Sequence, residues 1–420
     1  MHIYGIFLIL NAAPFFISTK ARFLITTTNL NNLMPMQQIR SAASFADSKP
    51  HYNILDGLRG VAALLVVWYH VHEGLSFAQG GTVITGINHG YLAVDFFFIL
   101  SGFVIGYAYD DRWGKTLTLG NFFKRRLIRL HPMVVMGTIV GAITFCIQGC
   151  VRWDGTQVPV SAVMLALLCG MFFIPAVPGM GRDVRGNGEM FPLNGPAWSL
   201  FFEYIGNIIY AVLICRLKTK VLAVLTGILG ALYAWFVITD VSGYGNMGVG
   251  WTLDSVNFLG GTLRMMFPYA TGMLLARNFK PVKVRGAFWI CSLVLLLLFI
   301  VPYIPSQGEA CLNGVFEFFC VAAIFPLLVV LGASGNTTDI RSTKICNFLG
   351  DISYPLYITH YPFMYLFYAW LIDTKQYTLA EVWPVAIGVF VWNVLFAWLC
   401  LRLYDLPVRK FLANKFLYRK

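Results

Sequence analysis

The chain has 420 residues, of which 58% are hydrophobic and 12% are charged. Soluble domains contain ~45–50% apolar and ~25% charged residues, so this composition excludes a soluble enzyme and predicts an all-helical protein with many membrane spans. The formal net charge of +12 comes from short basic blocks between apolar runs, which indicates membrane topology or contact with anionic groups and not nucleic-acid binding. Nine cysteines without a Cys-x-x-Cys pair indicate neither a disulfide framework nor a metal site.

The polypeptide divides into three parts. Residues 1–50 contain an apolar stretch that is short and has no basic residue before it, so we treat them as an uncertain N-terminal extension. Between residues 51 and 405, apolar runs alternate with short polar loops, which predicts one transmembrane domain. Residues 406–420 are rich in Lys and Arg and are expected to form a basic cytoplasmic tail.

Eleven apolar segments follow one another along the transmembrane domain. A spanning helix needs ~20 mainly apolar residues, and the candidates are 57–76, 91–109, 131–149, 161–179, 196–215, 220–239, 262–278, 287–304, 314–332, 351–372 and 382–403. Basic loops face the cytoplasm, and the basic stretches are 115–129, 215–220, 277–285, the loop with Arg341 and Lys344, and the tail.

The charge pattern leaves one conflict. The loops without Lys or Arg belong outside, and they are 240–260, 305–313 and 376–381. Passing from the basic stretch before residue 130 to an outer position at residue 195 takes an odd number of crossings, but two apolar segments lie between. We therefore expect either 131–149 or 161–179 to be re-entrant or partly inserted. This leaves ten full spans with both termini in the cytoplasm.

Arg59 and His70 stand at opposite ends of the first span. They are eleven positions apart, which places them on one helical face and ~16 Å apart. In one interpretation Arg59 is an interfacial anchor and His70 a hydrogen-bonded packing residue. In the other, His70 is a general base that accepts a proton from a hydroxyl. His72 is two positions on and points away.

The basic block FFKRRLIRLHP carries Arg126 and Arg129, which are i, i+3 neighbours on one face. The positive-inside rule explains such a block, and two adjacent guanidinium groups also suit a diphosphate. Pro132 is expected to mark the entry of the next helix.

Asp95 precedes the aromatic run of the second span, where a carboxylate needs a cationic or hydrogen-bonding partner. Ser101 and Gly102, in the middle of the same span, are expected to serve close helix packing.

Two later segments carry further polar residues. NGPAWSLFFEYIGN contains Trp198, Ser199 and Glu203, and its Glu203 either orients a histidine, holds a basic partner or forms a structural ion pair. DISYPLYITHYPF predicts an aromatic interface with a proline kink, and its His360 can hydrogen-bond across helices.

Together these motifs resemble the acyltransferase-3 family of integral membrane O-acyltransferases. LDGLRGVAALLVVWYH resembles its opening motif, VDFFFILSGF its second-helix signature and RRLIR its Arg-x-x-Arg motif. WSLFFEY and ISYPLYITHYP resemble two later motifs, in the right order, so that the resemblance runs from about residue 51 to residue 405.

The resemblance implies a ten-helix enzyme that takes an acyl group, with acetyl expected, from cytoplasmic acyl-CoA. The acceptor is a hydroxyl of a carbohydrate or glycosylated molecule. It implies catalytic roles for His70, Arg59 and Glu203, and CoA-phosphate contacts for Arg126 and Arg129. Substrate or structural support falls to the remaining motif residues, which are Asp95, Trp198, Ser199 and His360.

The sequence therefore predicts an acyl-CoA-dependent O-acyltransferase without a metal, embedded in lipid, in a bacterial inner membrane. The alternative is a carrier or exporter of polysaccharide or acyl groups, because the same polar residues would equally line a pathway. Neither the identity of the acceptor nor the length of the acyl chain follows from the sequence.

Overall fold

The computed structural model describes residues 51–81, 84–306, 311–335, 337 and 339–417, and within these residues it contains helices and no strand. Seven of the helices are long and apolar enough to cross a membrane, and shorter apolar helices accompany them. The prediction of an all-helical polytopic membrane protein is confirmed. The extension expected at residues 1–50 lies outside the described residues.

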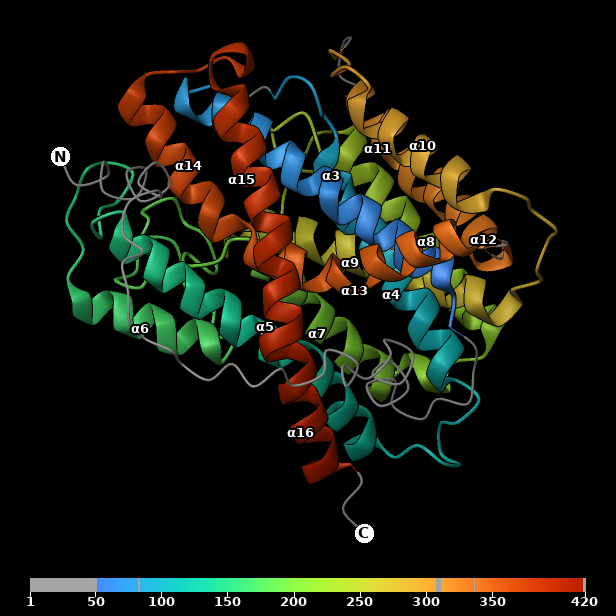
Figure 1. Ribbon diagram of the computed structural model, residues 1–420. Coiled ribbons are helices and arrows are strands. Elements are labelled where there is room, and N and C mark those ends of the chain that lie inside the picture. The colour runs from blue at the N-terminus through green and yellow to red at the C-terminus, as the bar shows by residue number, and fades with distance from the viewer. Residues whose placement is uncertain (1–50, 82–83, 307–310, 336, 338, 418–420) are drawn as a thin grey trace.

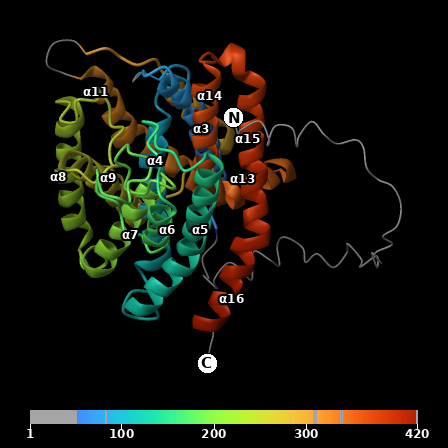
Figure 2. The same cartoon turned by 90° about the vertical axis from the view of Figure 1, so that its left-hand side faces the viewer.

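Two helix pairs form the centre of the bundle (Figure 1): α3 packs against α13, and α4 packs against α9. Figure 2 shows α8 at one edge of the bundle and α15 at the opposite edge. The longer helices in the described residues are α3 Asn53–Ala78, α4 Ala93–Tyr109, α5 Leu119–Ile147, α6 Val160–Met171, α7 Ala197–Val212, α8 Thr219–Ile238, α9 Ser255–Asn278, α10 Ala287–Ile300, α11 Leu312–Phe319, α12 Phe325–Ser334, α13 Ile340–Thr359, α14 Tyr361–Thr374, α15 Leu379–Cys400 and α16 Leu406–Phe416. Short turns of other helix types are η2 Gly90–Leu92, η3 Ile214–Arg216, η4 Cys320–Ile324 and η5 Leu401–Asp405.

Small residues let the α4 and α9 backbones touch. A Cβ atom on Gly102 would overlap the carbonyl of Tyr269, and one on Gly272 would overlap the carbonyl of Ile99. The packing role expected of Gly102 agrees with this contact. Ser101 differs from the expectation, because its hydroxyl donates a hydrogen bond to Glu203 at 2.8 Å.

The segment expected to be one span at 351–372 is two helices, α13 and α14, which meet at His360. The cause is Pro362, which has no N–H and cannot donate to the carbonyl of Ile358 four residues earlier. That carbonyl instead accepts a hydrogen bond from the side-chain amide of Asn194 at 2.9 Å. The single-span prediction for this segment is wrong, and the break places His360 inside the bundle.

The start predicted for the third segment is also wrong. Helix α5 begins at Leu119, and the Thr118 hydroxyl caps it by accepting a hydrogen bond from the backbone N–H of Asn121. Pro132 lies inside the helix and does not mark its entry. Lys, Arg and Leu are good helix formers, so the helix runs through the basic block before it reaches the proline. Arg126 and Arg129 are therefore helical residues of α5.

Helix α6 has 12 residues. At ~1.5 Å per residue it is ~18 Å long, which is shorter than the ~30 Å hydrocarbon core of a bilayer. The sequence did not decide which of 131–149 and 161–179 is only partly inserted, and the structure gives 161–179 the shorter helix. Irregular chain follows α6 as far as α7 at Ala197.

Candidate active site

His70 lies in the C-terminal half of α3, where its imidazole meets a carboxylate. Nδ1 of His70 is 2.6 Å from Oε2 of Glu73, because residues three apart are neighbours on a helix. The hydroxyls of Tyr361 and Tyr368 on α14 donate to the same carboxylate oxygen at 3.1 and 2.8 Å. With Nδ1 donating to Glu73, the neutral imidazole carries its free lone pair on Nε2, where it can accept a proton.

Glu73 was not among the predicted site residues. The signal that could have revealed it is its spacing, because His70 and Glu73 are separated by two residues on a helix. Tyr361 and Tyr368 carried no comparable signal, since they reach Glu73 from a helix almost three hundred positions later in the chain. Figures 1 and 2 show α14 beside α3, and the two helices pack together.

His360 joins this group at the break between α13 and α14. Its ring stacks on that of His70, with 5.2 Å between centroids and 28° between planes. Its Nδ1 faces the backbone carbonyls of Leu356 and Tyr357 at 3.1 and 2.9 Å, so Nδ1 carries the hydrogen. The side chain is fully buried, and its Nε2 has no hydrogen-bond partner among the described residues. This nitrogen is an unused acceptor beside His70.

Arg59 lies on the same helix as His70 but far from it. The eleven-residue separation corresponds to ~16 Å along α3. The guanidinium of Arg59 donates to Asp56 at 3.2 Å. Arg59 and His70, which belong to one sequence motif, therefore lie in two separate parts of the structure on the same helix.

Arg126 and Glu203 form an ion pair between α5 and α7. Nη2 of Arg126 lies 2.6 Å from Oε1 of Glu203, which also accepts the hydroxyl of Ser101. The sequence left several roles open for Glu203, and in the structure it holds a basic partner, Arg126. His70 contacts Glu73 and not Glu203.

Arg129 lies one helical turn from Arg126. The positive charges of Arg409, Arg59 and Arg126 lie close enough to Arg129 to interact with it electrostatically. Among the residues that the structure describes, Arg129 has no carboxylate within hydrogen-bond distance. The arginine cluster, defined here as Arg59, Arg126, Arg129 and Arg409, therefore gathers side chains from α3, α5 and α16.

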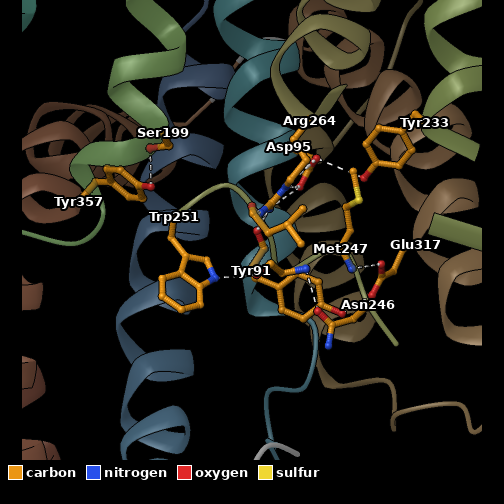
Figure 3. A network of polar contacts seen from close by, with 12 residues as sticks. Tyr91, Asp95, Ser199, Tyr233, Asn246, Met247, Trp251, Arg264, Glu317 and Tyr357 are labelled. Atoms are coloured by element: carbon orange, nitrogen blue, oxygen red, sulfur yellow. Dashed lines mark hydrogen bonds and ion pairs between the residues drawn. The ribbon is translucent and has the colours of Figure 1, made fainter. Parts of the chain in front are cut away.

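A second polar network holds Asp95 (Figure 3). Its partner is Arg264 of α9, whose Nη2 lies 2.7 Å from Oδ2 of Asp95, and both side chains are almost fully buried. The Tyr233 hydroxyl donates to Asp95 at 3.2 Å, and the ring of Trp198 faces the Arg264 guanidinium at 5.1 Å. The requirement for a cationic partner of Asp95 is met, and Arg264 is a buried charge that the sequence motifs did not single out.

Glu317 belongs to the same network (Figure 3). Tyr91 donates to its carboxylate, as do the amide of Asn313 and the backbone N–H of Met247, both at 2.7 Å. The carboxylate lies just before the π turn η4. In a separate contact Ser199 pairs with the Tyr357 hydroxyl at 2.7 Å, which joins α7 to α13.

The irregular chain between α6 and α7 contains a buried cluster of its own. Arg185 stacks on the ring of Tyr365, with 3.4 Å from Cζ to the ring centroid, and Tyr365 donates a hydrogen bond to Glu189. Burial raises the pKa of the Glu189 carboxyl to about 7, whereas the hydrogen bond from Tyr365 and the charge of Arg185 act in the opposite direction. Tyr365 also contacts Tyr361 edge to face at 4.6 Å, which links this cluster to the ring beside His70.

Within the described residues no group of three His, Cys, Asp or Glu side chains could hold a metal ion. A histidine held by a carboxylate inside a helical membrane bundle is able to accept and release a proton. The chain belongs to the acyltransferase-3 family, whose model, described as an acyltransferase domain, matches residues 52–402. The protein is accordingly an integral membrane acyltransferase.

Two relatives show how far the similarity extends. Protein 2 in the picA locus of Rhizobium radiobacter is 36% identical over 168 residues, which cover 38% of this chain and 80% of that protein. Peptidoglycan O-acetyltransferase OatA of Listeria monocytogenes is 24% identical over 399 residues, which cover 86% of this chain. The match spans only 56% of the length of OatA. No solved structure matches the chain.

Proposed function

We propose that this protein is an O-acyltransferase that moves an acetyl group from acetyl-CoA to a hydroxyl of a carbohydrate or glycosylated acceptor. The observation that carries the proposal is the contact between Nδ1 of His70 and Glu73, which leaves the other imidazole nitrogen, Nε2, to accept a proton. Membership of the acyltransferase-3 family and the name of its relative OatA support O-acetyl transfer. Residues 51–405 form the transferase domain in this proposal.

In the proposed reaction, Nε2 of His70 removes the proton from the acceptor hydroxyl. The hydroxyl oxygen attacks the thioester carbonyl, the carbon–sulfur bond breaks, and the departing thiolate of CoA takes the proton back from the imidazolium. Glu73 stabilises the transient positive charge on His70, and Tyr361 and Tyr368 hold Glu73 in place. His360 accepts a hydrogen bond from a second, neighbouring hydroxyl of the acceptor at its unused Nε2.

The donor reaches His70 from the arginine cluster in this scheme. Arg129 and Arg126 bind phosphate oxygens of CoA, because guanidinium groups match phosphate geometry. The ~16 Å between Arg59 and His70 along α3 is a distance that the flexible arm between the phosphates and the thioester of CoA has to cross. Helix ends that are rich in arginine face the cytoplasm. In this proposal the donor therefore enters from the cytoplasmic side of a bacterial inner membrane, the side on which both termini are expected.

The test is acyl transfer by the purified protein in proteoliposomes, followed by release of free CoA thiol. General-base catalysis contributes about 10²–10⁴-fold in rate, so His70→Gln is expected to lower kcat by that factor and Glu73→Gln by about 10²-fold. His72→Gln is the matched control, because His72 packs near Trp68 and Gly86, away from Glu73.

Unchanged thiol release in His70→Gln would disprove the role of His70. A wild-type protein that consumes no acyl-CoA with any hydroxyl acceptor, yet moves acyl groups or polysaccharide across the bilayer, would favour the carrier. The carbohydrate acceptor is identified separately, by mass spectrometry of surface glycans that lose an acetyl mass in a deletion strain.

A further inference from the structure

The C-terminal helix α16 returns to the start of α5 and brings one more arginine to the arginine cluster. Helices α15, η5 and α16 follow one another without a loop, and α16 packs on α5. Arg409 on α16 lies near Arg129 of α5. Arg409 lies beyond residue 402, where the match to the family ends, so the family motifs do not assign it a role.

Charges in the arginine cluster are unbalanced. Arg129 is the member without a carboxylate partner in the part of the chain that the structure describes. The other three members are paired: Arg59 with Asp56 at 3.2 Å, Arg126 with Glu203 at 2.6 Å and Arg409 with Asp405 at 3.0 Å. Four guanidinium groups thus face three carboxylates, which leaves an excess of one positive charge. Like charges held together away from water repel, and an anion relieves that repulsion.

The arginine cluster also has unused hydrogen-bond donors. Nε of Arg126 and Nε of Arg409 are both buried and lack a partner within the described residues. Arg126 is 8% exposed, and the Arg409 side chain is 14% exposed. Buried N–H groups are normally satisfied, so these two N–H groups are available to donate to a ligand. A phosphate group supplies several acceptor oxygens and the negative charge at once.

We propose that Arg409 of α16 completes a phosphate subsite with Arg129, and that this subsite binds a phosphate group of the acyl donor. The proposal rests on the proposed function, because the phosphate is that of CoA. Asp405 orients the Arg409 guanidinium through Nη1 and keeps its buried Nε available. The C-terminal segment is thereby part of the donor site.

The experiment measures the dissociation constants of CoA and dephospho-CoA, which lacks the 3′-phosphate, for the full-length protein in detergent. Arg409→Lys keeps the charge and a contact with Asp405 but loses the planar guanidinium. The double variant Asp405→Asn with Arg409→Gln removes both charges, so no buried carboxylate is left unpaired. Lys410→Gln removes one positive charge from an exposed neighbour on α16 and is the matched control.

We expect both Arg409 variants to bind CoA about tenfold more weakly, which corresponds to the loss of one charge-assisted hydrogen bond, with Lys410→Gln unchanged. If dephospho-CoA binding is unaffected, Arg409 contacts the 3′-phosphate; if it weakens equally, Arg409 contacts the diphosphate. CoA binding of wild-type strength in both variants would overturn the subsite and leave the proposed function intact. A wild-type protein that binds no CoA would overturn the subsite together with the proposed donor.

Discussion

The side-chain amide of Asn194 donates a hydrogen bond to the backbone carbonyl of Ile358, across 164 residues of sequence. Both groups are buried. The carbonyl has no donor within its helix, because the residue four positions later is Pro362, which has no N–H. The contact stabilises the break between α13 and α14 and thereby positions His360. The break in the helix is accordingly part of the site that surrounds His70.

Asn194→Ala is expected to destabilise the protein by about 1–3 kcal/mol, because the Ile358 carbonyl would be buried without a donor. The measurement is the melting temperature of the purified protein. Asn278→Ala is the control, since Asn278 makes the same kind of bond to the carbonyl of Leu274 at an exposed position, where a change within about 0.5 kcal/mol is expected. Equal effects in the two variants would contradict a special role for the break.

His360→Phe keeps a ring against His70 but removes the acceptor Nε2. We expect the KM for the acceptor to rise about tenfold while the KM for acyl-CoA stays constant, because the hydrogen bond that a neighbouring acceptor hydroxyl donates to His360 is lost. His131→Phe carries the same replacement at a half-buried site near Tyr204 and should leave both constants unchanged. If His360→Phe left the acceptor KM at its wild-type value, His360 would serve packing alone.

Arg129→Lys keeps the positive charge that sets topology and loses the planar guanidinium. We expect the KM for acyl-CoA to rise about tenfold, because a charge-assisted hydrogen bond contributes about 1.5–3 kcal/mol. Lys124→Gln, an exposed residue on the same helix, is the control and should leave this KM unchanged. An unchanged KM in Arg129→Lys would reduce the basic block to a topology signal.

Glu189 predicts a pH dependence of stability. Its pKa is about 7 in the folded protein, above the 4.5 of an unperturbed glutamate. The unfolded chain therefore ionises Glu189 first, and stability falls as pH rises from about 4.5 to about 7, by ~3 kcal/mol in total at about 1.4 kcal/mol per unit.

In Glu189→Gln this part of the pH dependence should disappear, so the difference in melting temperature between the variant and the wild type should grow from pH 4.5 to pH 7. Melting curves at several pH values measure it, and Asp154→Asn, at an exposed carboxylate, is the control. A difference that stays constant with pH would show that Glu189 is already ionised.

Thr118 precedes α5 and is expected to face the cytoplasm, because the basic block follows it. In a cysteine-depleted background, Thr118→Cys should react with an impermeant maleimide only after the membrane is opened. Tyr244→Cys, exposed in the loop without Lys or Arg, should react in intact cells. If Thr118→Cys reacted from outside, the topology would be opposite to the one expected, and the donor site would lie on the outer side of the membrane.

The family motifs were readable in the sequence because they depend on local spacing. Apolar runs of ~20 residues favour helices, since a backbone in lipid must satisfy its own hydrogen bonds. Helical geometry puts Arg59 and His70 on one face whatever the rest of the fold does. The same rule places Glu73 beside His70, so that pair was determined locally although it was not predicted.

Tertiary structure decided which side chains meet across the bundle. Nothing in the spacing indicates that Tyr361 and Tyr368 reach Glu73, or that Arg264 pairs with Asp95, because these contacts join helices far apart in the chain. Pro362 signals a break in the helix, but only the packed structure brings Asn194 to the carbonyl of Ile358 that the break leaves free. Local periodicity sets the face of a helix on which a residue lies, and only the packing of the helices sets what that face meets.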